Sequence, residues 1–280
     1  MRIAVTGGLG RLGHYVVKAS AQHTVRVFDI APGADCQADV RDLDAVRGGL
    51  RDIDVVVHLG AIDRSFATDD AATMQVNAMG TWNVFEAARQ MGVRRVVQCS
   101  SSSVLGLDQS NPTMPPAYLP IDEAHPLRAT DAYGLSKACG ERIAEAFSRR
   151  GMEVIVIRPC LVAFPEMLDF MAGRSAPEGR LESKPYLCTY VGPEDCARGF
   201  VAAAEVDYAG FEVFFLAAGD AFATEPTVQR LEALYGRPIP LHDAALYEHS
   251  PCASPVSYAA ANRRLGWRPT THWTPLGITA

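Results

Sequence analysis

The chain has little lysine, no paired cysteines and no long apolar run, and each shortage excludes a class of protein. Its 26 basic residues include only three lysines, and 32 acidic residues leave a net charge of −6, which argues against a nucleic-acid surface built on positive charge. Seven cysteines at irregular spacing, without a Cys-x-x-Cys pair, indicate reduced thiols and no metal site. Because we find neither a membrane-spanning run nor a signal peptide, we expect a cytoplasmic protein.

The composition that is present is typical of a compact globular protein. Of 280 residues, 48% are apolar and 21% charged, and the 23 glycines and 18 prolines are spread along the chain. We find no internal repeat and no low-complexity segment. Such a chain buries a sizeable core, as one large domain or two small ones.

Short β-branched runs alternate with helical stretches in the first half of the chain. Expected strands are Arg2–Thr6, Thr24–Phe28, Val55–Leu59, Val96–Cys99 and Val154–Ile157. Expected helices are Gly10–Ala21, Leu43–Leu50, Thr73–Gln90 and Ala132–Arg149. Several of these strands are apolar at nearly every position, as in parallel sheets buried on both faces. The strict alternation predicts right-handed crossovers and an α/β fold with a doubly wound parallel sheet of the Rossmann type.

A glycine-rich turn follows the first expected strand and opens the first expected helix. Glycines at 7, 10 and 13 form Gly-x-x-Gly-x-x-Gly. Glycine allows a tight turn and a close approach of the backbone to a pyrophosphate, and the helix amino terminus attracts the anion. The residues expected to bind a dinucleotide here are Gly7, Gly10, Arg11, Leu12 and Gly13.

Regular alternation ends after Ile157, where prolines and glycines interrupt the pattern. Beyond it, only Phe211–Ala217 resembles a core strand and Thr227–Tyr235 a clear helix. We therefore expect a dinucleotide-binding domain over residues 1–160. A small substrate-binding lobe over 161–280 is expected to contribute late strands to the same sheet and to cover its carboxyl edge, where ligands of doubly wound folds bind.

Two acidic positions are candidates for the adenosine half of the cofactor. Asp29 ends the second strand, 22 residues after Gly7, where an acid accepts from a ribose 2′-hydroxyl and repels a 2′-phosphate, so NAD is favoured over NADP. The alternative is a turn aspartate, and the arginines at 11 and 26 leave NADP open. Asp39 and Val40 form either an adenine-contacting pair or a plain helix cap.

Tyr133 and Lys137 lie four residues apart, hence on one face of an expected helix. A phenol titrates near pH ~10, and a neighbouring cation favours its phenolate and brings the phenol toward use as a base. With three lysines in the chain, this spacing is rarely met by chance. The alternative is an ordinary pair on an exposed helix.

A run of serines, Ser100 to Ser103, follows the strand Val96–Cys99, at the carboxyl edge of the expected sheet. A serine hydroxyl there can donate to a substrate oxygen while a tyrosine exchanges its proton, which holds a C–O group in place for hydride transfer. The alternative is a polar loop.

The order and spacing of these motifs resemble the extended short-chain dehydrogenase/reductase family, also called the NAD-dependent epimerase/dehydratase family. Further matching segments are His58-Leu59-Gly60-Ala61, Asn77-Ala78-Met79-Gly80-Thr81, Arg158-Pro159, Tyr190 to Ala197 and Leu265-Gly266-Trp267-Arg268-Pro269. The resemblance implies that Tyr133 is the general base, that Lys137 binds the nicotinamide ribose and lowers the tyrosine pKa, and that Ser101 orients the reacting oxygen. It also implies cofactor contacts at Leu59, Gly60, Ala61 and Asn77.

The sequence departs from the family pattern at two places near the serines. Leu105 replaces the usual tyrosine, which alters the substrate wall, and Ser102 and Ser103 stand where the dehydratase branch has an Asp-Glu pair. Elimination of water therefore lacks its acid and base. The short later region indicates a compact substrate, and uronate dehydrogenases are similarly short and share the Gly-Arg-Leu-Gly turn. Candidate substrate contacts are Ser65, Ser101, Ser102 and Arg174.

Three functions are compatible with these features. The first is NAD-dependent oxidation or reduction of a small sugar, sugar acid or polyol, the second is sugar epimerisation, and the third is an inactive dinucleotide sensor or scaffold. The resemblance also implies a homodimer through a four-helix interface. Apolar residues that share one stripe on the two helices are Val84, Phe85, Ile143 and Phe147, and part of this stripe is expected to pack on the sheet.

Overall fold

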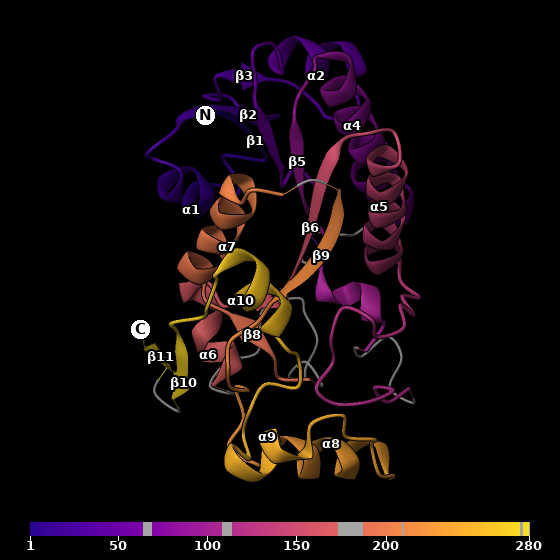
Figure 1. The fold of residues 1–280 in the computed structure, drawn as a ribbon, viewed down its shortest axis with the longest axis vertical. Helices are drawn as coiled ribbons and strands as arrows, with labels where there is room; N and C mark the ends of the chain where they lie inside the picture. The colour runs from indigo at the N-terminus through magenta and orange to yellow at the C-terminus, as the bar shows by residue number, and fades with distance from the viewer. Residues whose placement is uncertain (64–68, 108–113, 173–186, 209, 275–276, 280) are drawn as a thin grey trace. The chain divides into compact units, whose positions relative to one another are not determined.

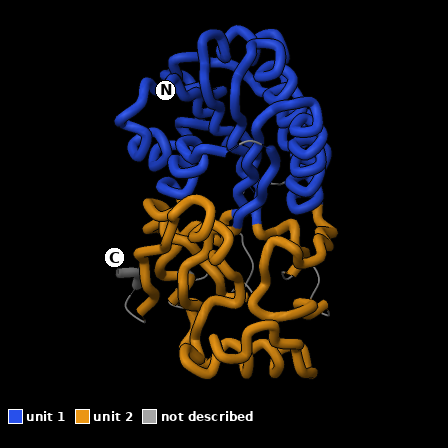
Figure 2. The backbone as a smooth tube through the Cα atoms, in the orientation of Figure 1, with its two compact units in different colours: residues 1–101, 132–158, 197–214 blue, residues 102–131, 159–196, 215–280 orange. Residues whose placement is uncertain are grey.

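The computed structural model describes residues 1–63, 69–107, 114–172, 187–208, 210–274 and 277–279. The chain divides into two compact units, drawn in blue and orange in Figure 2. Unit 1 consists of Met1–Ser101, Ala132–Arg158 and Ala197–Phe214, and unit 2 of Ser102–Asp131, Pro159–Cys196 and Phe215–Ala280. The chain thus passes between the units several times, once beside the boundary expected at residue 160. That 1–160 forms a domain of its own stays a prediction.

The central sheet has seven strands in the order β3-β2-β1-β4-β5-β6-β9. Their bounds are β1 (Arg2–Thr6), β2 (Thr24–Asp29), β3 (Cys36–Gln37), β4 (Val55–His58), β5 (Arg95–Cys99), β6 (Glu153–Pro159) and β9 (Phe211–Leu216). β1 pairs in parallel with β2 and β4, and β5 pairs in parallel with β4 and β6. The register sets Thr6 beside His58 and His58 beside Gln98. This order confirms the predicted doubly wound α/β fold.

Helices cover both faces of the sheet in unit 1 (Figure 1). Those of the first half are α1 (Arg11–Ala19), α2 (Leu43–Gly49), α3 (Asp70–Met74), α4 (Gly80–Gln90) and α5 (Ala132–Ser148), and α7 (Pro193–Glu205) follows later. In Figure 1, α1 and α7 lie on one face, and α2, α4 and α5 lie on the other. Helices α1, α2, α4 and α5 thus connect strands of the sheet, as the alternation predicts, whereas β2 leads to β3 without a helix.

The helix expected over Thr73–Gln90 is present without a break, but it is not α-helical throughout. The structure has α3, then a π-helical turn over Gln75–Met79, and then α4. Sequence periodicity does not reveal a π turn, since its one extra residue changes the phase of only a short stretch. The turn contains Asn77, whose buried side chain makes three hydrogen bonds that compensate for the less regular backbone.

The apolar stripe expected at a dimer interface belongs instead to the core of unit 1. Val84, Phe85 and Phe147 are fully buried, and Ile143 packs against the same cluster. Because α4 and α5 pack against the sheet and each other, these side chains are not available to a second copy. Large apolar side chains that do face outward on these elements are Met79, Trp82 and Leu135.

Unit 2 holds shorter elements around two further apolar clusters. They are β7 (Leu161–Val162), α6 (Leu168–Met171), β8 (Tyr190–Val191), α8 (Thr227–Tyr235), α9 (Ala244–His249), α10 (Ala259–Leu265), β10 (His272–Thr274) and β11 (Gly277–Thr279). Asp195 anchors the segment after α10, because its carboxylate accepts hydrogen bonds from the backbone N–H and hydroxyl groups of Thr270 and Thr271. In addition, the indole N–H of buried Trp267 donates to the Asp195 carbonyl.

A search of the described residues finds no helix long and apolar enough to cross a membrane.

Candidate functional site

The glycine-rich turn joins β1 to α1 in a conformation that depends on glycine. Gly7 has φ of 69°, in the left-handed region, and its carbonyl accepts from Gly10 N–H at 3.0 Å. A Cβ on Gly13 would stand 2.2 Å from the Gly7 carbonyl oxygen, so a side chain there displaces the backbone. Gly10 caps α1 without a side chain of its own, which leaves that helix end open to an anion. The turn therefore fits a pyrophosphate, as expected from the sequence.

Asp29 braces this turn from the end of β2. Its Oδ2 accepts from Leu9 N–H at 2.9 Å and its Oδ1 from Ala31 N–H at 3.0 Å. The second bond is the one expected of a turn aspartate, and the first attaches the carboxylate to the glycine-rich turn. Each carboxylate oxygen can accept more than one hydrogen bond, so a ribose hydroxyl is compatible with both contacts. The two interpretations of Asp29 are thus not exclusive.

The arginines that left NADP open have other partners. Arg26 donates to the carbonyls of Gly49 and Arg51 at 2.9 and 2.7 Å. Arg11, the first residue of α1, forms an ion pair with Asp63, which lies beyond the end of β4. This carboxylate beside the phosphate-binding turn escaped the sequence analysis, because nothing in the spacing links residues 11 and 63.

Asp39 and Val40, which precede α2, make different contacts in the structure. Asp42, and not Asp39, caps α2 by accepting from Asp44 and Ala45 N–H. The Asp39 carboxylate holds Arg41 through hydrogen bonds from its Nε and Nη2, and these bonds lower the pKa of Asp39. Val40 is buried beside Gly60 and Gly80, where an added Cβ would contact its methyl groups. Contact of this pair with adenine stays a prediction.

The segment after β4 lies directly against the glycine-rich turn. Leu59 N–H donates to the Thr6 carbonyl at 3.0 Å, and a Cβ on Gly7 would stand 2.8 Å from Gly60 N. Leu59, Gly60 and Ala61 are each partly exposed. Together with the turn they form the carboxyl edge of β1 and β4, where the sequence placed their cofactor contacts.

The side-chain amide of Asn77 makes its hydrogen bonds to other residues of the protein. Its Oδ1 accepts from Ile62 N–H at 2.7 Å, and its Nδ2 donates to the Ile62 carbonyl at 3.0 Å and to Ser136 Oγ at 3.1 Å. The side chain therefore joins the segment after β4 to α5. With an exposed fraction of 2%, it acts as a support for the site, and its direct contact with cofactor stays a prediction.

The structure brings Tyr133 and Lys137 together with the end of β5. Lys137 Nζ lies 5.7 Å from the centroid of the Tyr133 ring and donates to the Cys99 carbonyl at 3.0 Å. Burial lowers the pKa of Lys137, and nearby Cys99 and Asp63 partly oppose that shift. Ser101 follows two residues after Cys99 and is partly exposed, as is Tyr133. The three candidate catalytic residues thus all lie in unit 1, on α5 and at the carboxyl end of β5.

A buried ion pair fixes α5 to the sheet one turn beyond Lys137. Arg158 Nε and Nη2 each donate to a Glu141 carboxylate oxygen at 2.8 Å, and Ser100 Oγ donates to Oε1 at 2.5 Å. Both charged side chains are about 5% exposed. The sequence analysis missed Glu141, although its place four residues after Lys137 on the same helix face was the available signal.

The remaining substrate candidates are less well placed. Ser65 and Arg174 lie outside the described residues. Ser102 opens a 3₁₀ turn, Ser102–Leu105, in unit 2, and its contact with substrate stays a prediction. Among the described residues, no cluster of His, Cys, Asp or Glu has the arrangement of a metal site.

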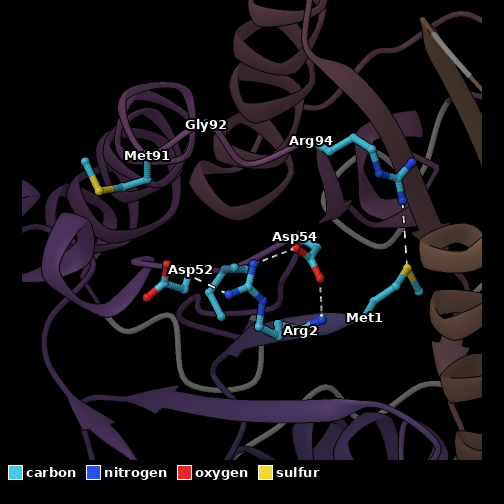
Figure 3. A pocket seen from close by; sticks show the side chains of 8 residues that line it. Met1, Arg2, Asp52, Asp54, Met91, Gly92 and Arg94 are labelled. Atoms are coloured by element: carbon cyan, nitrogen blue, oxygen red, sulfur yellow. Dashed lines mark hydrogen bonds and ion pairs between the residues drawn. The ribbon is translucent and has the colours of Figure 1, made fainter.

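A shallow hollow of about 390 Å³ lies at the amino ends of β1 and β4 (Figure 3). Arg2 there donates to Asp54 through its backbone N–H and its guanidinium, and Arg94 points to the sulfur of Met1. The hollow lies at the edge of the sheet away from Tyr133 and Lys137, and its lining has no nucleophile or histidine. The candidate site is therefore the carboxyl edge.

Comparison with known proteins gives one family for most of the chain. The family described as "NAD dependent epimerase/dehydratase family" matches residues 3–210. A uronate dehydrogenase of Pseudomonas syringae pv. tomato is 33% identical over 170 residues, which are 56% of this chain and 58% of that protein. An L-arabinose 1-dehydrogenase (NAD(P)(+)) of Haloferax volcanii is 31% identical over 219 residues, 73% of this chain and 82% of that protein. The chain thus covers less than two thirds of the uronate dehydrogenase's own length.

Among solved structures, a short-chain dehydrogenase/reductase superfamily protein from Agrobacterium tumefaciens with bound NAD superimposes with a TM-score of 0.70. The two chains are 25% identical, and the match covers 98% of this chain and 94% of that one. The likeness extends through both units, including the later half, where the sequence pattern is weakest.

Proposed function

The chain belongs to the NAD dependent epimerase/dehydratase family, as its motifs predicted, and on this premise we propose that it is an NAD-dependent oxidoreductase of a small sugar, sugar acid or polyol. The observation that carries the proposal is the grouping of Tyr133 and Lys137 beside the carboxyl end of β5. This grouping provides a base, a cation and a nearby serine at the edge of the sheet where doubly wound folds bind their ligands.

The glycine-rich turn supports NAD as the cofactor. The space beside Gly7 and Gly13 is too narrow for a side chain, and the open end of α1 favours a pyrophosphate. Asp29, at the end of β2, would repel a 2′-phosphate, so NAD is favoured over NADP. NAD, when bound, accepts the hydride that leaves the substrate carbon.

The chain's own residues would then handle the proton and the oxygen. In the oxidative direction Tyr133 Oη takes the proton of the substrate hydroxyl as the C–H hydride departs, and in reduction it returns the proton. The ammonium of Lys137 favours the phenolate form of that base. Ser101 Oγ donates to the reacting oxygen and holds it in place.

Sugar and sugar-acid substrates are favoured by the relatives, which are named as dehydrogenases of uronate and of L-arabinose. The second candidate function is sugar epimerisation, which the family description includes. The two differ in stoichiometry, because an epimerase returns the hydride to its substrate and releases no net NADH.

The test is a panel of uronates, aldoses and small secondary alcohols incubated with NAD. Steady accumulation of NADH absorbance with at least one of them supports the oxidoreductase, and isomer exchange seen by NMR without NADH supports the epimerase instead. Tyr133→Phe is expected to abolish either activity, whereas Tyr208→Phe, a tyrosine of the same unit outside the site, is the matched control. Unchanged activity in Tyr133→Phe would refute the assignment of the base, whereas neither NADH nor isomer exchange from the wild-type protein would favour the sensor or scaffold hypothesis.

A homodimer is part of the same proposal, with an interface that differs from the expected stripe. Met79, Trp82 and Leu135 are 57%, 36% and 46% exposed and lie on neighbouring helical segments, so we take them as the candidate apolar surface. Sedimentation tests this surface. Leu135→Glu is expected to give monomers, and Leu234→Glu, at an equally exposed leucine of α8, is expected to leave the dimer intact.

A further inference from the structure

A buried chain of polar side chains begins at the glycine-rich turn and crosses the sheet. Thr6, the last residue of β1, is hydrogen-bonded through Oγ1 to His58 Nδ1 at 2.7 Å. His58 Nε2 lies 3.0 Å from Thr81 Oγ1 on α4. All three side chains are 4% exposed or less, and none of them was a site candidate from the sequence. Buried polar groups of this kind are retained only where every hydrogen bond is made.

The donors and acceptors in this series of side chains can be arranged in only one way. Thr81 Oγ1 donates to the Asn77 carbonyl at 2.5 Å, so it can only accept from His58, and His58 Nε2 must carry the proton. His58 Nδ1 is then the acceptor for the Thr6 hydroxyl, whose oxygen accepts from Gly60 N–H at 3.1 Å. Every donor has an acceptor only if the imidazole is neutral with its proton on Nε2.

The surroundings of His58 favour the same state. Burial, together with the charge of nearby Lys137, lowers the pKa of His58 to about 3. A second ring proton on Nδ1 would also leave the Thr6 hydroxyl without an acceptor. The ring therefore stays neutral in the working range of the enzyme, and Lys137 is not opposed by a second buried cation.

At its other end, this series of hydrogen bonds reaches α5, the helix that carries Tyr133 and Lys137. The backbone carbonyl of Asn77 accepts the hydrogen bond from the Thr81 hydroxyl. The side-chain amide of Asn77 accepts from Ile62 N–H and donates to Ser136 Oγ. Ser136 Oγ in turn donates to the Tyr133 carbonyl at 2.7 Å. A path of hydrogen bonds thus leads from Gly60 and Thr6, which lie next to the glycine-rich turn, through Asn77 to the backbone of Tyr133.

We propose that His58, held as the neutral Nε2–H tautomer, is a positioning residue. Through Thr81 and Asn77 it fixes α5, the helix of Tyr133 and Lys137, relative to the glycine-rich turn. The inference rests on the proposed oxidoreductase function, because it assigns the path a role in aligning Tyr133 for proton transfer. Hydrogen bonds suit this role better than apolar contacts, since they fix both distance and direction. A misplacement of roughly 1 Å at a reacting group lowers rates on the order of 100-fold.

The tautomer can be measured without any activity. Protein labelled with ¹⁵N at histidine is examined by two-dimensional ¹H–¹⁵N NMR at neutral and mildly acidic pH, with His58→Gln used to assign the signal. We expect the pattern of a neutral ring protonated at Nε2 at both pH values, whereas an ordinary exposed histidine becomes cationic at the lower one. A ring protonated at Nδ1, or a cationic ring, overturns the proposal.

The role of the path is tested with Thr81→Val against Thr73→Val. Both threonines are buried, and each donates to the carbonyl four residues before it, but within the described part of the chain Thr73 Oγ1 bonds only to the Asp69 carbonyl. We expect Thr81→Val to lower kcat roughly 10- to 100-fold and to leave the dissociation constant of NADH, measured by fluorescence, within about twofold. Thr73→Val is expected to keep both values.

A third variant separates positioning from plain destabilisation. Thr81→Ser keeps the hydroxyl and is expected to restore most of kcat. Equal losses in the Thr81→Val and Thr73→Val variants, or no rescue by Thr81→Ser, would overturn the positioning role. If the wild-type protein transfers no hydride to or from any substrate of the panel, the proposed function fails instead, and the NMR result still decides the state of His58.

Discussion

The buried pair of Glu141 and Arg158 allows a quantitative test of how α5 is held to the sheet. In the variant Arg158→Met, a side chain of similar length replaces the cation and leaves the Glu141 carboxylate buried, with the Ser100 hydroxyl as its remaining partner among the described residues. Removing one member of a buried ion pair costs about 3–5 kcal/mol, because the remaining charge is uncompensated. At about 2–4 °C per kcal/mol for a chain of this size, Tm should fall by roughly 6–20 °C.

Calorimetry or thermal circular dichroism measures this effect, with two controls. Arg142→Met removes an arginine of the same helix whose side chain is 78% exposed, and it should change stability by about 0.5 kcal/mol or less. The double variant Glu141→Leu with Arg158→Met removes both charges and should recover most of the loss. The reasoning is refuted if Arg158→Met behaves like Arg142→Met, or if the double variant recovers nothing.

Three further predictions concern the turn, the cofactor preference and unit 2. Gly13→Ala places a methyl group 2.2 Å from the Gly7 carbonyl oxygen and should weaken NADH binding about tenfold or more in a fluorescence titration, an overpacking cost of about 1–3 kcal/mol. Asp29→Asn should raise the ratio of kcat/KM with NADP to that with NAD about tenfold, because it removes the charge that repels a 2′-phosphate. Burial raises the pKa of Asp195, but hydrogen bonds, led by those from Thr271, outweigh burial and leave the pKa lowered. The Asp195 carboxylate therefore stabilises the fold above the ordinary carboxyl pKa, and this stabilisation is lost as pH falls through the lowered pKa. Asp195→Ala should therefore lower Tm at pH 7, and the difference from the wild type should narrow toward pH 3.

The sheet of unit 1 was predictable because its signals are local. Val55-Val56-Val57 is buried on both faces, and its strand ends at His58, one residue before the predicted end. The whole of β1 coincides with its predicted bounds, and in unit 2 the helix α8 does as well. Unit 2 was not predictable to the same degree, since its strands are only two or three residues long and depend on contacts between distant segments.

For the site, the sequence provided the residues proposed to meet ligands but not those that hold them in place. Tyr133, Lys137 and the glycine-rich turn follow motifs with fixed spacing, so one sequence sufficed to propose them. The path through His58 depends instead on the register of β1 with β4 and on a π turn at Asn77, neither of which leaves a periodic signal. A histidine in an apolar strand is more often a satisfied core residue than a ligand, and here its partners are Thr6 at the end of β1 and Thr81 on α4. The residues that couple two parts of a site can therefore be sought among buried polar groups whose hydrogen bonds join different elements, even where no motif identifies them.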